Sequence, residues 1–194
     1  MFTGLIEDLG EIVAVEHSGD GVRLQVRTEL AGQIGEGDSI AVNGVCLTAT
    51  EIHDSVFSTD VMNETLKLTS LAETREGSPV NLELAMSPAD RFGGHIVQGH
   101  VDGVGRIAQV APDGFSKRVK IEAPADVLKY VVYKGSITVD GISLTVAELD
   151  DRSFTVSLIP ETLERTNLGS AEPGTIVNLE VDVLAKYVER LINR

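Results

Sequence analysis

Two short blocks of the sequence each place a small reactive or hydrogen-bonding side chain two residues before a threonine. VNGVCLT carries Cys46 and Thr48, and VDGISLT carries Ser143 and Thr145. Alternate residues of a strand point to the same face, so each pair would present two polar groups side by side. Such a pair can bind the edge of a polar heterocycle. A lone cysteine is as often a small buried apolar residue, and that alternative stays open for Cys46.

A histidine and a lysine add two further groups that could act on a ligand. His100 lies in QGHVDG, and a histidine titrates near neutral pH and commonly serves as a general base. Lys134 lies in a turn before the VDGISLT block, from which its ammonium could donate to a ligand carbonyl. The alternatives are a histidine hydrogen-bonded to the backbone and a solvated turn lysine.

Other chemistries lack the residues that they need. The histidines show no spacing typical of a zinc site, and no P-loop, GxGxxG or GxSxG motif occurs. We therefore expect no metal and no other cofactor. The 16 Lys and Arg residues against 30 Asp and Glu residues give a net charge of −14, which disfavours nucleic acid and anionic membranes as partners.

The expected location is the cytoplasm. Cys46 is the single cysteine, so no intrachain disulfide can form, which fits a reducing compartment. The opening MFTGLIEDLGE carries acidic residues early and does not resemble a signal peptide. No apolar run approaches the roughly 18 residues of a membrane span.

The chemical blocks belong to an internal duplication. Three segments recur at a constant offset of 97 residues: VNGVCLTATEI (42–52) at 139–149, MNETLKLTSL (62–71) at 159–168, and GSPVNLE (77–83) at 174–180. Five of the eleven positions in the first pair are identical. Two copies are too few for a solenoid, so each unit of roughly 95 residues is expected to be a domain.

Within each copy, apolar residues alternate with polar ones, which is typical of strands. Val22, Leu24 and Val26 follow this period. Strand-like segments are expected at 4–15, 21–28, 38–43, 45–52, 55–61 and 79–86, with counterparts in copy two. Six short strands favour a closed barrel, because closure leaves no unpaired edge. The expected fold class is therefore all-β, with two tandem six-stranded antiparallel barrels.

Helices are expected at a few places only. Asn63 and Pro160 begin equivalent helices, with an asparagine cap or a proline in the first turn, and 125–132 forms a third. The tail at 182–194 breaks the repeat and has one apolar helical face, formed by Leu184, Tyr187, Val188, Leu191 and Ile192. So short a helix is marginal alone. It packs either on its own barrel or, as we favour, on other copies of the chain.

The sequence blocks resemble those of the riboflavin synthase family. MFTGLIE, VNGVCLT, GGHIVQGH, YKGSITVDGISLTV and LIPETLERTNLG look like the hallmark segments of that family, and the resemblance covers essentially all 194 residues. It implies lumazine-binding barrels of Greek-key topology at 1–95 and 96–181. It also implies a homotrimer built by the helix at 182–194, with each active site between the first barrel of one subunit and the second barrel of its neighbour.

The resemblance implies the last step of riboflavin biosynthesis. Two molecules of 6,7-dimethyl-8-ribityllumazine would be dismutated to riboflavin and 5-amino-6-(D-ribitylamino)uracil, by transfer of a four-carbon unit and without a cofactor. Two similar pockets can hold two identical substrates, and such positioning lowers the barrier. The C7 methyl of lumazine is acidic because its anion delocalises into the pteridine, so a modest base is enough. Whether the trimer associates with lumazine synthase stays open.

Site residues follow from the resemblance, position by position. The pocket of copy one would comprise Gly4, Leu5, Ile6, Cys46, Leu47, Thr48, Asp60, Val61, Met62, Asn63, Glu64 and Thr65. The pocket of copy two would comprise Gly99, His100, Val101, Lys134, Ser143, Leu144, Thr145, Leu158, Ile159, Pro160, Glu161, Thr162 and Leu163, and Phe2 would close over the site. His100, Ser143 and Thr145 would transfer protons or activate a nucleophile at C7, and Cys46 would position substrate or attack it.

Two other classes of protein share this barrel. Antenna proteins of luminous bacteria bind a lumazine or flavin without catalysis, but both half-sites are intact in this chain, which favours the enzyme. A flavin-binding reductase would need an attached nucleotide-binding α/β domain, for which the chain has no length left.

Overall fold

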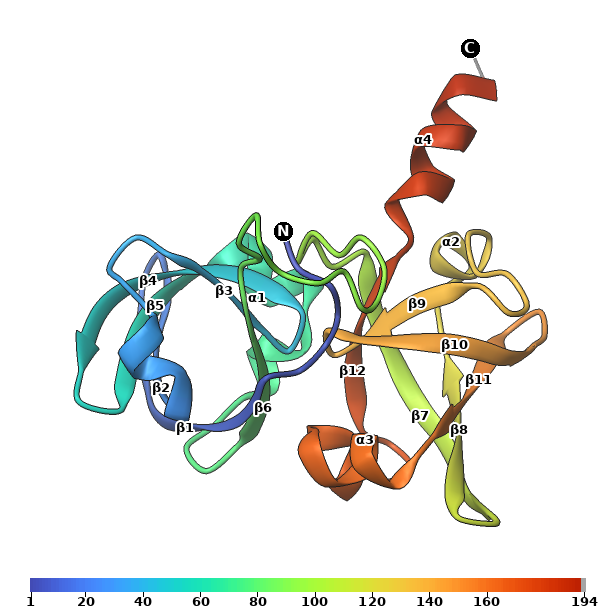
Figure 1. Cartoon of the computed structure of the whole chain (residues 1–194), viewed down its shortest axis with the longest axis horizontal. Coiled ribbons are helices and arrows are strands. Elements are labelled where there is room, and N and C mark those ends of the chain that lie inside the picture. The colour runs from blue at the N-terminus through green and yellow to red at the C-terminus, as the bar shows by residue number, and fades with distance from the viewer. Residues whose placement is uncertain (193–194) are drawn as a thin grey trace.

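The computed structural model describes residues 1–192, which form two closed antiparallel barrels side by side (Figure 1). Barrel 1 contains β1 (Asp8–Ser18), β2 (Gly21–Arg27), β3 (Ser39–Val42), β4 (Val45–His53), β5 (Val56–Met62) and β6 (Pro79–Leu84). Barrel 2 contains β7 (Gly103–Asp113), β8 (Ser116–Glu122), β9 (Ser136–Val139), β10 (Ile142–Leu149), β11 (Ser153–Leu158) and β12 (Ile176–Val181). The order around barrel 1 is β1-β2-β5-β4-β3-β6, and barrel 2 repeats it with its own strands. The predicted fold class is confirmed.

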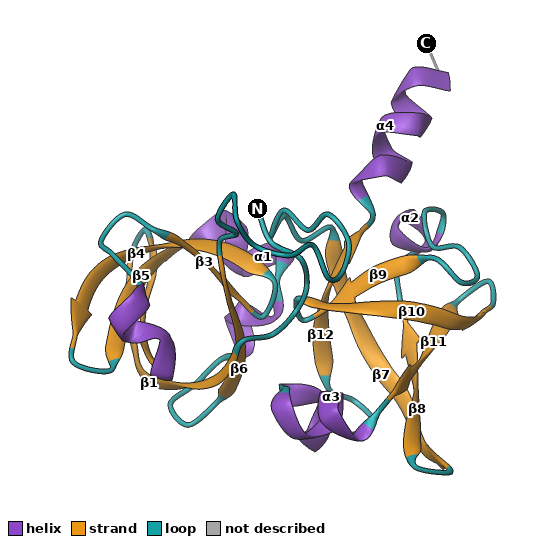
Figure 2. Ribbon diagram, in the orientation of Figure 1, coloured by secondary structure: helices purple, strands orange, loops and turns teal. Residues whose placement is uncertain are grey.

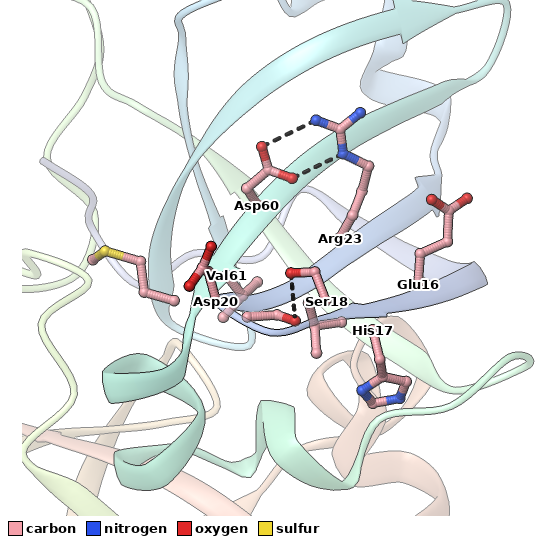
Figure 3. Close-up of a pocket in the computed structure, with 10 residues that line it drawn as sticks. Glu16, His17, Ser18, Asp20, Arg23, Asp60 and Val61 are labelled. Carbon is pink, nitrogen blue, oxygen red and sulfur yellow. Dashed lines mark hydrogen bonds and ion pairs between the residues drawn. The ribbon is translucent and has the colours of Figure 1, made fainter.

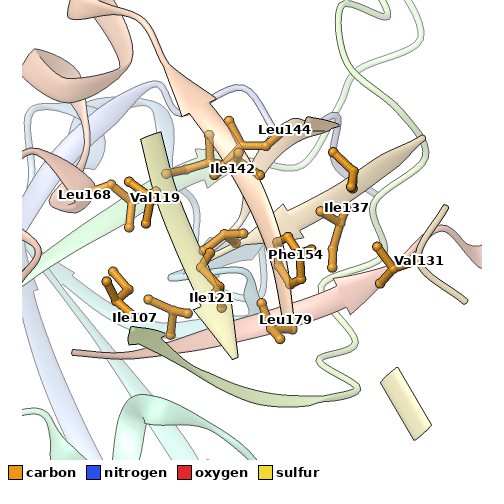
Figure 4. Close-up of a cluster of buried hydrophobic side chains, with 14 of the residues drawn as sticks. Ile107, Val119, Ile121, Val131, Ile137, Ile142, Leu144, Phe154, Leu168 and Leu179 are labelled. Atoms are coloured by element: carbon orange, nitrogen blue, oxygen red, sulfur yellow. The ribbon is translucent and has the colours of Figure 1, made fainter. Parts of the chain in front are cut away.

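Each barrel has its own apolar core, built mainly from valine, isoleucine and leucine. Val22, Leu24 and Val26 of β2 point inward, as their alternation with polar residues predicts. A single phenylalanine from the strands fills each centre, Phe57 in barrel 1 and Phe154 in barrel 2 (Figure 4). Burial of one such side chain stabilises the fold by about 1.5–3 kcal/mol. The outward-facing residues of the strands are therefore not needed for the core and can contact a ligand or another part of the protein.

Both barrels bend at equivalent bulges. The register of β1 on β2 shifts between Ile12 and Ala14, and that of β7 on β8 shifts between Ile107 and Gln109. The registers of β4 on β5 and β10 on β11 shift in the same way after Ala49 and Val146. A bulge adds local twist and bends its strand. The repeat thus preserves the corners of the barrel as well as its strands.

The remaining elements are short (Figure 2). They are the helices α1 (Asn63–Leu68), α2 (Ala125–Leu128) and α3 (Pro160–Arg165), and 3-10 turns at Glu29–Gln33, Ser70–Glu73 and Asn167–Ser170. The predicted helix at 125–132 is thus a single turn. Asn63 is also not the cap of α1, because Met62 holds that position and the Asn63 side chain donates to Gly19 O at 3.2 Å.

The two barrels meet through their equivalent hairpin turns. Asn43-Gly44 and Asp140-Gly141 both have positive φ, as a two-residue hairpin loop requires. A Cβ on Gly44 would lie 2.6 Å from the backbone nitrogen of Gly141, so the tips are in contact. Asn178 Nδ2 donates to Asn43 O at 2.8 Å across this interface. The barrels are therefore packed and hydrogen-bonded together.

The last helix, α4 (Val183–Ile192), points away from both barrels (Figure 1). The predicted apolar residues from Leu184 to Ile192 are all more than half exposed. One flank touches barrel 2, where Lys129 Nζ lies 2.9 Å from Glu189 and Lys186 Nζ lies 2.6 Å from Asp102. Residues 193–194 of the predicted tail lie outside the described residues. No helix within 1–192 is long and apolar enough to cross a membrane.

Candidate functional site

The paired polar residues of each barrel lie on its outer wall. In β4, Val45, Leu47 and Ala49 point into the core, while Cys46 is half-buried and Thr48 is exposed. In β10, Ser143 and Thr145 occupy the same outward positions, half-buried and exposed. The two polar groups of each pair therefore share one face, which a ligand could approach from outside the barrel.

The segment that leads into each barrel crosses to the other one (Figure 2). Ser143 N of barrel 2 donates to Gly4 O at 2.8 Å, and Cys46 N of barrel 1 donates to Gly99 O at 2.9 Å. The segments pair where they cross, since Phe2 N donates to Val97 O at 2.8 Å.

This crossing corrects the predicted grouping of the pockets. Residues 4–6 lie with Ser143 and Thr145, and residues 99–101 lie with Cys46 and Thr48. The side chain of Ile6 packs on the core of barrel 2, and that of Val101 packs on the core of barrel 1. A repeat offset shows which residues are equivalent, but it does not show on which barrel a connecting segment packs.

Glycine is required at both crossing points. Gly4 has φ +79° and Gly99 has φ +77°. A Cβ on Gly4 would lie 2.6 Å from Cβ of Ser143, and one on Gly99 would lie 2.5 Å from Cβ of Cys46. The backbone therefore lies directly against the two polar side chains.

Two buried glutamates hold the crossing segments in place. Glu83 accepts from Thr3 N at 2.6 Å and from Gly4 N at 2.9 Å. Glu180 accepts from Gln98 N at 2.8 Å, Gly99 N at 3.0 Å and His100 N at 3.1 Å. Burial raises the pKa of both carboxyls, and these backbone bonds oppose the rise.

Neither glutamate was predicted as a functional residue. The signal was present in the repeated VNLE segment, where Glu83 and Glu180 are equivalent. Their position at the end of a buried strand gave no indication of which backbone they bind.

His95 and Ser143 form a hydrogen-bonded pair at barrel 2. The distance from His95 Nδ1 to Ser143 Oγ is 2.7 Å, and the histidine is only 8% exposed. Burial lowers the pKa of His95, an effect that the charge of Asp182 opposes. A neutral imidazole bonded to a hydroxyl can take up a proton through it. This pair was not predicted, because its two residues lie 48 positions apart in the chain.

The predicted base, His100, is exposed on the segment that crosses to barrel 1. Its backbone nitrogen is bound by Glu180. The structure therefore separates His100 from Ser143 and Thr145, with which it was grouped.

Phe2 does not close over a site. It is fully buried in a small cluster with Ala41 and Val97, and Cys46 packs against the same cluster. Its side chain packs with Val97 of the other crossing segment and with Ala41 of barrel 1.

Several other predicted ligand contacts point into the barrel cores. Leu47, Val61, Leu144 and Leu158 are at most 9% exposed, because inward positions alternate with the outward ones. Their side chains cannot meet a ligand on the outer wall. Besides Thr48, His100 and Thr145, the predicted residues with exposed side chains are Leu5, Asp60, Met62, Asn63, Glu64, Lys134, Ile159, Pro160 and Glu161.

A surface cavity of about 520 Å³ borders the wall of barrel 1 beside Asp60 and Met62 (Figure 3). Asp60 accepts two hydrogen bonds from Arg23, at 2.8 and 3.1 Å. These bonds lower the pKa of the Asp60 carboxyl. Asp60 is therefore an ionised group with its charge compensated by Arg23.

Comparison with known proteins agrees with the duplicated fold. Residues 3–85 and 98–182 each match the lumazine binding domain. The chain is 55% identical to riboflavin synthase of Mycobacterium bovis, with 99% of this chain and 98% of the relative covered. It is 50% identical to riboflavin synthase of Actinobacillus pleuropneumoniae, with 99% and 90% covered. LumP complexed with riboflavin has a similar fold, with a TM-score of 0.88 at 24% identity, over 93% of this chain and 99% of that one.

The fold and the matched residues define a protein with two tandem lumazine binding domains. Among such proteins, the relatives that match this chain over its full length at 50–55% identity are riboflavin synthases, which are enzymes. The chain belongs to the riboflavin synthase family.

Proposed function

We propose that this chain dismutates two molecules of 6,7-dimethyl-8-ribityllumazine to riboflavin and 5-amino-6-(D-ribitylamino)uracil. The observation that carries the proposal is that both barrels keep a complete polar wall beneath a crossing segment. Cys46 and Thr48 lie under 99–101, and Ser143 and Thr145 lie under 4–6. Two ligand sites are what a reaction between two identical substrates requires. LumP, which shares the fold, has been solved with this lumazine and with riboflavin.

The catalytic roles follow from the positions of the groups. Ser143 and His95 act as the relay that takes a proton from the C7 methyl, since their side chains are 2.7 Å apart and burial favours the neutral imidazole. Thr145 orients the same ligand. Cys46, Thr48 and His100 serve the ligand on barrel 1. No metal or cofactor takes part.

We assign the chain to three units: barrel 1 at 1–95, barrel 2 at 96–181 and an oligomerisation helix at 182–194. The apolar face of α4 is exposed, and a homotrimer would cover it. In that trimer, barrel 1 of one subunit faces barrel 2 of its neighbour, so that the two lumazines meet. The enzyme would act in the cytoplasm, where lumazine synthase is a candidate partner.

The decisive experiment is incubation of the purified chain with 6,7-dimethyl-8-ribityllumazine alone. One riboflavin should form for every two lumazines consumed, without metal, nucleotide or reductant. Retained lumazine fluorescence without growth of flavin absorbance, in a folded preparation, would reject the enzyme and favour a binding protein.

A further inference from the structure

The walls of the two barrels differ in charge at one pair of equivalent arginines. Arg23 on β2 pairs in register with Asp60 on β5, and Arg118 on β8 pairs in register with Ser157 on β11. The duplication thus keeps the arginine and replaces its carboxylate partner by a hydroxyl.

The replacement leaves Arg118 with one carboxylate partner where Arg23 has two. Arg23 has two aligned bonds to Asp60 and a third to Glu51 at 3.3 Å. Arg118 has only Glu148, whose Oε1 lies 2.6 Å from Nη2. That contact is misaligned: within 1–192, Nη2 of Arg118 is the one buried side-chain nitrogen or oxygen without a hydrogen bond. Nη2 of Arg118 therefore has an ion-pair partner but no aligned hydrogen bond, which an acceptor atom of a ligand could supply.

A second replacement adds another cation to the same wall. Lys134 N donates to Val146 O at 2.9 Å, as Gly37 N donates to Ala49 O at 2.8 Å, so the two residues are equivalent. Lys134 has φ +63°, a conformation that favours glycine. A lysine that replaces glycine at such a position adds an exposed ammonium at the cost of backbone strain.

The two cations flank the polar pair of barrel 2. Thr145 pairs in register with Ser136, two residues after Lys134. On the other side of β10, Val146 pairs with Val156 of β11, so Thr145 lies beside Ser157. Ser157 in turn pairs with Arg118 of β8, the next strand. Adjacent strands lie about 4.8 Å apart, so Thr145 and Arg118 are separated by roughly 10 Å, the span of one fused heterocycle.

We propose that barrel 2 binds the lumazine that loses its C7 methyl proton and that Arg118 and Lys134 stabilise its anion, while barrel 1 binds the second lumazine uncharged. This inference rests on the proposed function. When the methyl C–H bond breaks, its electron pair delocalises into the pteridine. The proton passes to Ser143 Oγ, whose own proton passes to His95 Nδ1. On barrel 1, Asp60 compensates Arg23 and Gly37 brings no charge, so that wall offers no free cation to an anion.

The test is to give barrel 2 the carboxylate that barrel 1 has. Ser157→Asp should compensate Arg118 as Asp60 compensates Arg23, and Ser157→Asn is the uncharged control of equal size. One added charge beside the ligand should raise the pKa of the bound lumazine by roughly one unit. The readout is the absorbance of neutral and anionic lumazine immediately after rapid mixing, as a function of pH, together with the rate of riboflavin formation.

The expected result is a rate about tenfold lower for Ser157→Asp than for Ser157→Asn below that pKa. Riboflavin binding, measured by quenching of its fluorescence, should stay within about twofold, since this ligand carries no such anion. Arg118→Met should raise the pKa likewise, and Arg118→Lys should restore part of the shift, which covers the case that Ser157→Asp does not fold.

The inference would be overturned if the bound lumazine had the same pKa and the same rate in Ser157→Asp and Ser157→Asn, and an unshifted pKa in Arg118→Met, while the enzyme still made riboflavin. Absence of riboflavin formation by the wild-type chain would instead overturn the proposed function.

Discussion

Asp140 should make the stability of this protein fall as the pH rises from about 4 to about 7. The residue is 2% exposed at the contact between the barrels, where its carboxylate accepts from Asn178 N at 2.7 Å and from Asn167 Nδ2 at 2.8 Å. Burial raises its pKa from 3.8 to about 7, because two hydrogen bonds do not replace the lost hydration. Copy one has the neutral Asn43 in the equivalent turn.

The magnitude follows from the difference between the two pKa values. Between about pH 4 and pH 7 the folded chain keeps a proton on Asp140 that the unfolded chain has released, so the free energy of unfolding falls with rising pH. A shift of roughly 3 units corresponds to about 4 kcal/mol lost across this window. Asp140→Asn removes the titration. Asparagine fits the turn, because Asn43 has the same φ of 46° and its Oδ1 accepts from Asn81 N at 2.8 Å.

The assay is urea denaturation of wild type and Asp140→Asn, followed by circular dichroism at fixed protein concentration from pH 4 to pH 8. At pH 4 the variant should be about 1 kcal/mol less stable, since Asn167 Nδ2 loses the nearer of its two acceptors. At pH 8 it should be more stable than wild type by about 3 kcal/mol. The control is Asp151→Asn, which removes an exposed carboxylate of the same barrel. The free energy of unfolding of this control should follow that of wild type over the whole pH range. A stability difference between Asp140→Asn and wild type that stays constant over this range would refute the reasoning.

Further predictions concern catalysis, the crossing segments and assembly. Ser143→Ala and His95→Gln should each slow riboflavin formation by roughly 10²–10⁴-fold with lumazine binding retained, and wild-type turnover in either would show that the pair is structural. His100→Leu should leave ligand binding largely intact and slow turnover. If binding and turnover fell together, His100 would contribute to substrate binding rather than to transition-state stabilisation. Glu180→Gln should lower the free energy of unfolding by about 2–4 kcal/mol, because the new amide nitrogen faces backbone donors; unchanged urea denaturation would contradict this. Deletion of 182–194 should lower the mass measured by light scattering, whereas an unchanged mass would place the apolar face of α4 within its own chain.

Much of the fold was predictable because it depends on local pattern. Alternation in segments such as Val22 to Val26 indicated strands, and the constant offset of 97 residues indicated two equivalent domains. The shared face of Ser143 and Thr145 was also predicted correctly, since residues two apart on a strand point to the same side. Leu144 and Leu158 were predicted as ligand contacts from the family resemblance, but the same alternation points their side chains into the core.

The sequence by itself therefore determined two barrels, their strand order through the resemblance, and the polar pair on each wall. Only the tertiary structure decided that the leading segments exchange barrels, that the Phe2 side chain is buried where they cross, and that His95 meets Ser143. The physical reason is the range of the interactions. Strand patterns repeat every two residues, whereas the bonded residues Ser143 and Gly4 lie 139 positions apart and Glu180 and Gly99 lie 81 apart. Those partners depend on how the two closed barrels pack together, which the alternation of residues along a strand does not predict.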